Sequence, residues 1–200
     1  MKQESRQLQT EYEATFIDIN VGHIRETLQA LGGVLKRPQF MQKRMVYSFP
    51  KGHEIQGGFL RVRDEGDKIT MSIKIMEASG TIDGQKEIEL TVNSYNNATQ
   101  FLQTIGAEPR SEQESKRELW ELNDTQIMID WWPFLEPFIE IEGPSEDAVK
   151  NVANTLGCQW EDAIFDSVDA IYSSIYNISK DRVNNHTPKI LFNMENPFLG

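Results

Sequence analysis

Two arginines in the segment "FLRVR", Arg61 and Arg63, stand two residues apart where the residue pattern predicts a β-strand. Side chains at positions i and i+2 of a strand lie on the same face, so we expect the two guanidinium groups to lie side by side. Lys74 falls on the next predicted strand, in the segment "MSIK". Because a guanidinium can bind two phosphate oxygens at once, this spacing indicates a site for a strongly anionic group.

Carboxylates recur at the same spacing on other strand-like segments. The like-charged pairs are Glu11 with Glu13, Glu87 with Glu89, and Glu140 with Glu142, and Asp130 lies in the segment "IMID". One interpretation is an antiparallel sheet with one solvated face, on which such charges are ordinary surface residues. The alternative is a sheet curled into a barrel with its charged face inward. The repulsion between like charges on each strand favours the barrel, where Mg²⁺ or Mn²⁺ and an anionic ligand would offset it.

The chain as a whole is acidic, with a formal net charge of -11. This balance argues against a general nucleic-acid or anionic-membrane surface, because both need positive charge spread over the protein. The clustered cations are explained if a metal-bound polyphosphate has to approach an acidic protein. We therefore expect a small-molecule partner, with no nucleic acid and no membrane.

Compartment and domain organisation follow from equally simple features. Cys158 is the single cysteine, so we expect no disulfide within the chain. The opening segment "MKQESRQLQT" has no apolar region and no run approaches about 18 apolar residues, so we expect a cytoplasmic location. Two hundred residues with 38% hydrophobic content fit one domain. We expect this domain over residues 1–180 and an irregular tail over 181–200 that could cap an opening.

The elements that must position the charged residues alternate between strands and helices. Strand-like segments are residues 11–19, 43–49, 58–66, 68–76, 86–92, 116–122, 125–132 and 137–143. Amphipathic helices are predicted over 23–31, 97–105 and 146–156, each followed by a glycine, and a fourth helical pattern covers 162–176. Turn residues at 64–66, 83–84 and 123–124 predict hairpins, which make the sheet antiparallel. The pattern is typical of an α+β fold with helices packed outside a β-barrel.

Seven short segments occur in an order that resembles the CYTH superfamily, the triphosphate tunnel metalloenzymes, which include class IV adenylate cyclases and thiamine triphosphatases. The segments are "EYEAT", "LRVR", "MSIK", "KEIEL", "SKREL", "IMID" and "FIEIEG", and the resemblance as a whole spans about Glu11 to about Tyr172. Any one of them is weak evidence, whereas seven in order are specific. The resemblance implies an eight-stranded antiparallel barrel, or tunnel, that binds a triphosphate together with Mg²⁺ or Mn²⁺.

The resemblance also implies roles for individual residues. The implied metal ligands are Glu11, Glu13, Asp130, Glu140 and Glu142, and the implied phosphate-binding residues are Arg61, Arg63, Lys74 and Arg117. Glu11, Glu13, Arg61 and Arg63 would form the catalytic set. Lys116 is a weaker candidate, because adjacent residues of a strand face opposite ways. Glu87 and Glu89 match an acidic strand of the family without a defined role.

One position departs from the family pattern. The opening motif of the family is Glu-x-Glu-x-Lys, and this chain has Thr15 where the lysine is expected. The resemblance implies that, in the hydrolases of the family, this lysine contacts phosphate and helps to activate a water molecule. Threonine offers a hydroxyl and no charge. Lys43, Arg44 or Lys86 are the cations that could replace it, and the sequence does not place them.

Three functions are compatible with these residues. The first is a metal-dependent triphosphatase that cleaves the terminal phosphate of inorganic triphosphate or of a small organic triphosphate, such as a nucleoside or thiamine triphosphate. The second is a class IV-type adenylate cyclase, for which Trp131 and Trp132 could form a base-stacking platform, although a loop packed on the barrel is the preferred interpretation of this segment. The third is a non-catalytic binding module, which Thr15 favours. A monomer and a homodimer are both compatible with the sequence.

Overall fold

The computed structural model describes residues 8–77 and 80–199. Alternation of apolar and polar residues produces the strands of the fold. In chain order the strands are β1 (Gln9–Phe16), β2 (Val34–Ser48), β3 (Gly58–Asp64), β4 (Ile69–Met76), β5 (Gln85–Val92), β6 (Glu108–Leu122), β7 (Thr125–Trp131), β8 (Phe138–Gly143) and the two-residue β9 (Lys189–Ile190). The helices are α1 (Val21–Ala30), α2 (Tyr95–Thr104), α3 (Glu146–Thr155), α4 (Val168–Tyr176) and α5 (Lys180–Asn185), with a short 3₁₀ helix η1 (Trp160–Asp162).

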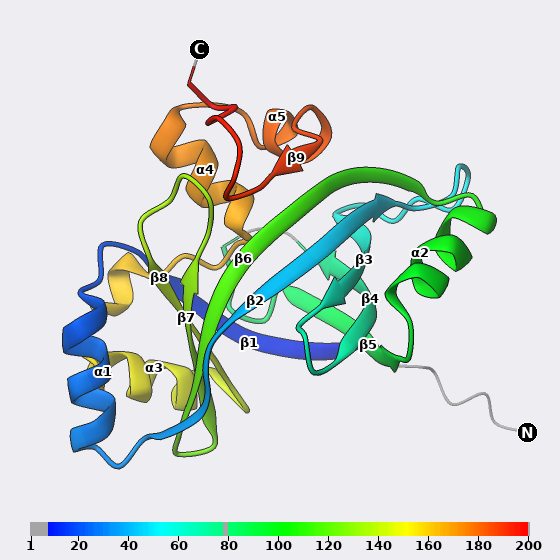
Figure 1. Cartoon of the computed structure of the whole chain (residues 1–200). Coiled ribbons are helices and arrows are strands. Elements are labelled where there is room, and N and C mark those ends of the chain that lie inside the picture. Colours follow the sequence, from blue (N-terminus) through cyan, green and yellow to red (C-terminus); the bar gives the residue numbers. More distant parts are fainter. Residues whose placement is uncertain (1–7, 78–79, 200) are drawn as a thin grey trace, which may run out of the picture.

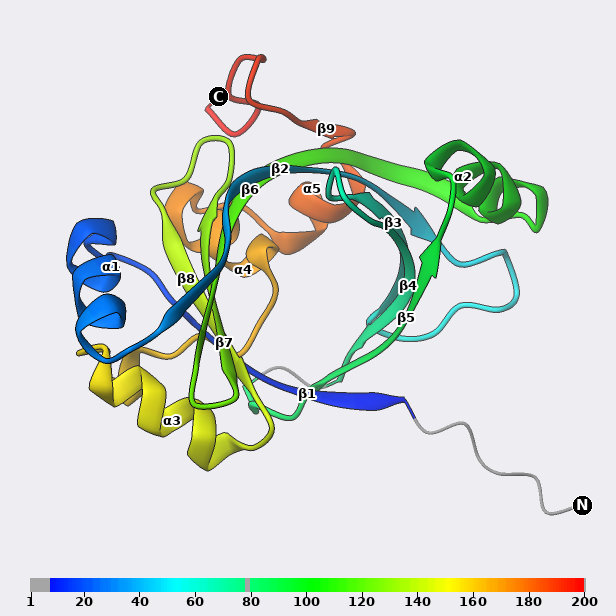
Figure 2. The ribbon, with the colours of Figure 1, turned by 60° about the horizontal axis from the view of Figure 1, so that its bottom comes forward.

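Within the described residues, the first eight strands form a closed antiparallel barrel. Their order is β2-β3-β4-β5-β1-β8-β7-β6, and β6 pairs back onto β2 to complete the ring. The two closing strands are each 15 residues long, and their pairing shifts register three times, which lets them bend around the barrel. The predicted α+β class and the eight-stranded barrel with external helices are therefore confirmed (Figures 1 and 2).

The apolar side chains face outward from the barrel and are covered by the helices. On one side, α1 and α3 cover β1, β7 and β8, where Leu28, Ile127, Ile141 and Val149 are fully buried. On another side, α2 covers the outer face near β3, with Leu60, Val62 and Leu102 in the contact. The main apolar clusters thus lie between the wall and the helices, which leaves the inner face of the wall free for charged residues.

The three predicted amphipathic helices are present and end before the expected glycines, while α1 and α2 begin two residues earlier than predicted. The side chains of Asn20, Ser94 and Ser145 accept hydrogen bonds from the backbone three residues on and begin α1, α2 and α3. Gly32, Gly106 and Gly157 follow these helices with φ between 79° and 93°, a conformation that strains any side chain with a Cβ. The fourth helix begins later than predicted, at Val168, because η1 and an extended segment occupy residues 160–167.

The segment 181–200, predicted to be an irregular tail, contains most of α5 and also β9. Ser179 caps α5, and β9 adds to β6 in parallel outside the closed ring. Val183, Ile190 and Phe198 are buried against Tyr172 of α4, which supplies the apolar contact that orders this segment. Residues 1–7 and Gly200 of the predicted boundaries lie outside the described residues, and the domain limit at 180 stays a prediction. Among the described helices, none is long and apolar enough to span a bilayer.

Candidate functional site

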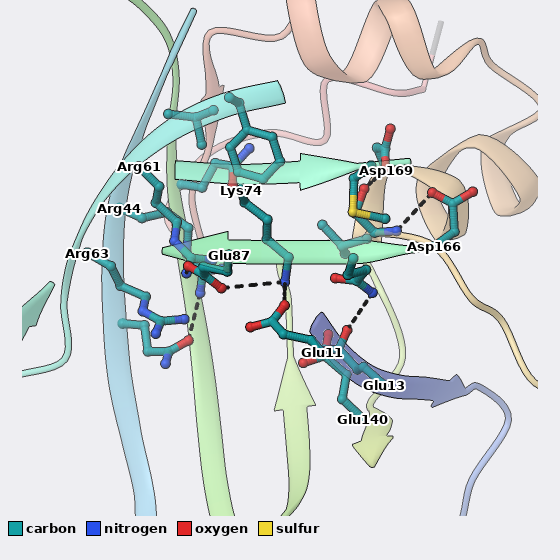
Figure 3. Close-up of a pocket in the computed structure, with 18 of the residues that line it drawn as sticks. Glu11, Glu13, Arg44, Arg61, Arg63, Lys74, Glu87, Glu140, Asp166 and Asp169 are labelled. Atoms are coloured by element: carbon teal, nitrogen blue, oxygen red, sulfur yellow. Dashed lines mark hydrogen bonds and ion pairs between the residues drawn. The ribbon is translucent and has the colours of Figure 1, made fainter. Parts of the chain in front are cut away.

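The barrel encloses a cavity of about 750 Å³. Strand alternation directs one set of charged residues from seven strands into it: Glu11, Glu13, Arg44, Arg61, Arg63, Lys74, Glu87, Glu89, Arg117, Glu140 and Glu142. Figure 3 shows Arg44, Arg61 and Arg63 on one side of the space and Glu11, Glu13 and Glu140 on another. Because these residues line an internal cavity, the interpretation of the charged strands as an ordinary solvated sheet face is wrong.

One end of the cavity is covered by the C-terminal helices. Asp166, Asp169, Lys180 and Asn184 line the same cavity as the barrel residues, and Figure 2 shows α4 and α5 within the outline of the ring. Lys180 pairs with Asp166, while Asn184 donates to Asp169 at 2.6 Å. Polar partners within the cap therefore satisfy these groups.

The cations of β3 and β4 are ion-paired with carboxylates on the same inner surface. Arg61 lies 2.8 Å from Glu87, and Lys74 lies 3.0 Å from Glu11. Arg63 contacts Glu65 at 2.7 Å and Glu89 at 3.1 Å. Burial opposes the charge of Lys74, but the surrounding glutamates outweigh burial and raise its pKa. Lys74 is therefore charged, and carboxylates of the same inner surface lie beside all three cations.

Arg117 of β6 has the most complete set of partners. Its Nε and Nη2 atoms donate to the two carboxylate oxygens of Asp130 at 2.7 and 2.5 Å, and Nη2 also lies 2.5 Å from Glu140. Burial again opposes the charge, while Asp130 and Glu140 raise the pKa of Arg117 well above its ordinary value. Asp130 is fully buried with both oxygens used in this way.

Two carboxylates of β1 and β8 lack a cation partner among the described residues. Glu13 and Glu142 face each other across the paired strands, and no ion pair links either of them to a cation in residues 8–77 and 80–199. Burial raises the pKa of Glu13, and it does the same for Glu140 and Glu142. Burial raises the pKa of Glu11 to about 8 despite Lys74, whereas Arg61 and Lys74 overcome burial and lower the pKa of Glu87 to about 2.

This excess of buried acid fits a divalent cation by charge and donor type. Carboxylate oxygens are the ligands that Mg²⁺ and Mn²⁺ prefer. In the part of the chain that the structure describes, no three His, Cys, Asp or Glu side chains converge in a ready-made metal cluster. The donors are instead distributed over the β1–β8 wall, as expected if part of the coordination comes from a ligand.

Comparison with known proteins agrees with this geometry, since the CYTH domain matches residues 10–170. The chain belongs to the CYTH family. A conserved hypothetical protein from Pyrococcus furiosus is 19% identical with a TM-score of 0.65, covering 79% of this chain and 97% of that chain. A protein from Vibrio parahaemolyticus, described as a proposed adenylate cyclase, is 16% identical with a TM-score of 0.72, covering 84% and 99%. At these identities the likeness shows the fold.

Two further matches are more distant or partial. A protein from Hippeastrum, described as a proposed adenylyl cyclase with a dominant triphosphatase activity, is 12% identical with a TM-score of 0.51, covering 82% of this chain and 94% of that chain. A Gibberella zeae protein named "Probable transporter MCH1" is 29% identical over 103 residues, which is 49% of this chain. The aligned part is 18% of that protein's length.

The residues that the CYTH resemblance singled out are placed as follows. Those that line the cavity are Glu11, Glu13, Arg61, Arg63, Lys74, Arg117, Glu140 and Glu142. Asp130 lies behind them as the partner of Arg117. Lys116 points away and stacks over the Phe192 ring at 5.0 Å, as strand alternation predicts. Their functional roles stay predictions.

Thr15 and the cations that could replace the CYTH lysine are also placed. Thr15 is 2% exposed, and its backbone pairs with Ile164. Lys43 lies outside the barrel, 3.9 Å from Glu114, and Lys86 pairs with Glu77 at 2.6 Å. Of the three candidates, Arg44 is the one that lines the cavity.

Some cavity residues were missed by the sequence reasoning. Gln42 and Glu65 line the cavity beside Arg44 and Arg63, and Gln85 donates to Glu13 at 3.1 Å. The signal for the first two was the same alternation of side chains that identified Arg61 and Arg63.

The segment 131–138 forms a loop packed on the barrel, which was the preferred interpretation of its sequence. Trp132 is buried against Tyr172, and the Arg44 guanidinium lies over the Trp132 ring, 4.4 Å from its centre.

Proposed function

We propose that the protein is a divalent-metal-dependent phosphohydrolase that cleaves the terminal phosphate of inorganic triphosphate or of a small organic triphosphate. The observation that carries this proposal is one cavity with Arg44, Arg61 and Arg63 on one side, the carboxylates of β1 and β8 on another, and Lys74 between Glu11 and Glu87. Proteins of the CYTH family bind triphosphates and generally depend on divalent metals, which supports the same function. An anion and a metal together would neutralise both sides of this cavity.

The basic residues would bind and orient the phosphate chain. Arg61, Arg63 and Arg117 offer planar donor pairs that fit phosphate oxygens, and Lys74 offers a point charge. Each of them now contacts a carboxylate at 3.1 Å or less, so a phosphate oxygen would replace an oxygen of similar charge. Donors that are already charged and fixed can offset the charge of the transferred phosphoryl group with little rearrangement.

The acidic wall would hold the cation. Glu13, Glu140 and Glu142 are the proposed main ligands, with Glu11 beside them, and Mg²⁺ or Mn²⁺ when bound supplies phosphate charge neutralisation and an acidified water. Asp130 was predicted to join this set. Since both of its oxygens accept hydrogen bonds from Arg117, its geometry favours a positioning role on that arginine.

A product assay with three substrates tests the proposal. Purified protein is incubated with tripolyphosphate, ATP or thiamine triphosphate, with Mg²⁺, Mn²⁺ or chelator, and the products are identified by ³¹P NMR and chromatography. We expect orthophosphate and pyrophosphate from tripolyphosphate in the presence of metal. Cyclic nucleotide and pyrophosphate from ATP would instead indicate a cyclase. Metal-dependent binding of all three compounds without products would indicate a binding module.

The substitution Thr15→Lys tests whether the missing lysine limits turnover. Position 15 is buried opposite Glu140 in the β1–β8 register, so a lysine there would compete with Arg117 for that carboxylate. We therefore expect the rate of tripolyphosphate hydrolysis to stay equal or to fall. A rise of about tenfold or more, equivalent to about 1.4 kcal/mol of barrier, would show that the site lacks a needed cation. Thr15→Val, which adds no charge, is the matched control.

A further inference from the structure

Arg44 differs from the four cations that are proposed to bind phosphate. Arg61, Arg63, Lys74 and Arg117 each have a carboxylate partner within 3.1 Å. Arg44 is 6% exposed and, in the described ranges 8–77 and 80–199, makes no ion pair. Its hydrogen bonds go to two neutral acceptors, Gln42 and Ser115. A buried cation without a counter-ion is unfavourable, and such groups persist in proteins where a ligand supplies the charge.

The surroundings of Arg44 increase this charge imbalance. Burial lowers the pKa of Arg44 well below its ordinary value, and the neighbouring Arg63 and Arg61 guanidinium groups lower it further. Asp130 opposes these effects, but both of its oxygens are bound to Arg117. Three guanidinium groups therefore lie together on this side of the cavity, where Figure 3 shows Arg44 beside Arg61 and Arg63.

The position of Arg44 is nevertheless fixed by its contacts. Nη2 donates to Gln42 Oε1 at 2.7 Å and to Ser115 Oγ, and Ser115 Oγ donates in turn to the same Gln42 oxygen at 3.0 Å. The guanidinium lies 4.4 Å from the centre of the Trp132 ring, which Tyr172 contacts edge-on. Nε is buried with no hydrogen-bond partner in the described part of the chain. The group is thus held on one edge and one face, with a donor still free.

We propose that Arg44 is an additional phosphate-binding residue, which receives an inorganic phosphate group of the substrate and supplies the positive charge that Thr15 does not. This inference rests on the proposed function, and it concerns a segment, "QKRMV", outside the seven that carry the CYTH resemblance. The other four cations already have a carboxylate counter-ion, with which phosphate must compete, whereas Arg44 has none among the described residues. Arg44 is therefore the first contact for the anion and binds it even without metal.

The test compares Arg44→Gln with Arg25→Gln, an arginine of α1 that pairs with Glu118 at 2.7 Å and does not line the cavity. Binding of pyrophosphate without metal, and of tripolyphosphate with Mg²⁺, is measured by calorimetry. We expect Arg44→Gln to weaken both by about tenfold to a hundredfold, as for loss of a charged hydrogen bond, and Arg25→Gln to change neither. Without ligand, the melting temperature should be equal or higher in Arg44→Gln and lower in Arg25→Gln.

Arg44→Lys keeps the charge and should retain more affinity than Arg44→Gln, which also covers the case where the glutamine variant does not fold. Unchanged affinity in Arg44→Gln would overturn the inference. A lower melting temperature together with unchanged affinity would show that Arg44 is a structural arginine. Wild-type protein that binds tripolyphosphate without hydrolysing it would refute the proposed hydrolase activity and leave the role of Arg44 standing. Wild-type protein that binds neither anion would refute both.

Discussion

Replacing Arg117 by methionine is expected to lower the free energy of unfolding by about 3–5 kcal/mol, because the change leaves a buried carboxylate without its counter-ion. Asp130 is fully buried, and both of its oxygens accept hydrogen bonds from this one side chain. Glu140 would lose a partner at 2.5 Å as well. Chemical denaturation of the metal-free protein measures the effect.

Two variants control this experiment. Arg117→Met combined with Asp130→Leu removes the buried pair together and should recover most of the lost stability, while triphosphate affinity stays low because the proposed phosphate-binding group is gone. Lys36→Met breaks the exposed pair with Glu121, at 3.2 Å, and should cost about 1 kcal/mol or less. A loss below about 1 kcal/mol in Arg117→Met would show that Asp130 does not depend on this arginine.

The pair between Arg117 and Asp130 could have been predicted from the sequence. Asn123 and Asp124 both adopt positive φ, as expected for a two-residue hairpin turn, so Leu122 must pair with Thr125. Counting back along both strands brings Arg117 opposite Asp130, as observed. The family pattern directed attention to Asp130 as a metal ligand, whereas the local register identifies its partner.

The residues that surround Arg44 could not be derived from a hairpin turn in this way. They depend on the pairing of β2 with β6, neighbouring strands that are separated in the sequence by β3, β4, β5 and α2 and whose pairing shifts register three times. Alternation correctly predicts which side chains of a strand share a face, as it did for Arg61 and Arg63. It does not say that Gln42 will lie opposite Ser115, so it could not distinguish Arg44 from Lys43 or Lys86.

The helix and strand of the C-terminal segment were missed for a different reason. α5 has six residues and β9 has two, lengths at which local periodicity carries little information. Their order comes from tertiary contacts of Val183, Ile190 and Phe198 with Tyr172. The sequence did suggest that the tail could cap an opening, and the structure places Lys180 and Asn184 on the cavity lining.

The ion pairs inside the cavity link the proposed metal and phosphate sites. Lys74 holds Glu11, and Arg117 holds Glu140, so proposed phosphate-binding groups are paired with proposed metal ligands. A phosphate that binds Lys74 or Arg117 without metal must compete with these carboxylates, and a metal that binds Glu11 or Glu140 without phosphate must compete with these cations. When both bind, each ion pair is replaced by a new one. We therefore expect metal and triphosphate to increase each other's affinity by the same factor, as linkage requires.

Glu13→Gln combined with Glu142→Gln should remove most of this coupling. These two residues face each other across β1 and β8, and neither has a cation partner among the described residues. We expect Mn²⁺ affinity, measured with the slowly hydrolysed imidotriphosphate present, to fall by about a hundredfold or more, since two charged ligands are lost. The melting temperature without metal should be equal or higher, because two buried carboxylates that repel each other become neutral.

The matched control neutralises two carboxylates outside the cavity, Glu112→Gln with Glu121→Gln, which pair with exposed lysines on β9 and β2. This variant should keep the affinity for Mn²⁺ and for imidotriphosphate, so a loss there would indicate a general charge effect. Unchanged metal affinity in the Glu13 and Glu142 double variant, combined with a clearly lower melting temperature, would show that these carboxylates stabilise the barrel and do not bind the cation. Independent binding of metal and triphosphate to the wild-type protein would contradict the exchange of partners, because the ion pairs in the cavity would then not need to open.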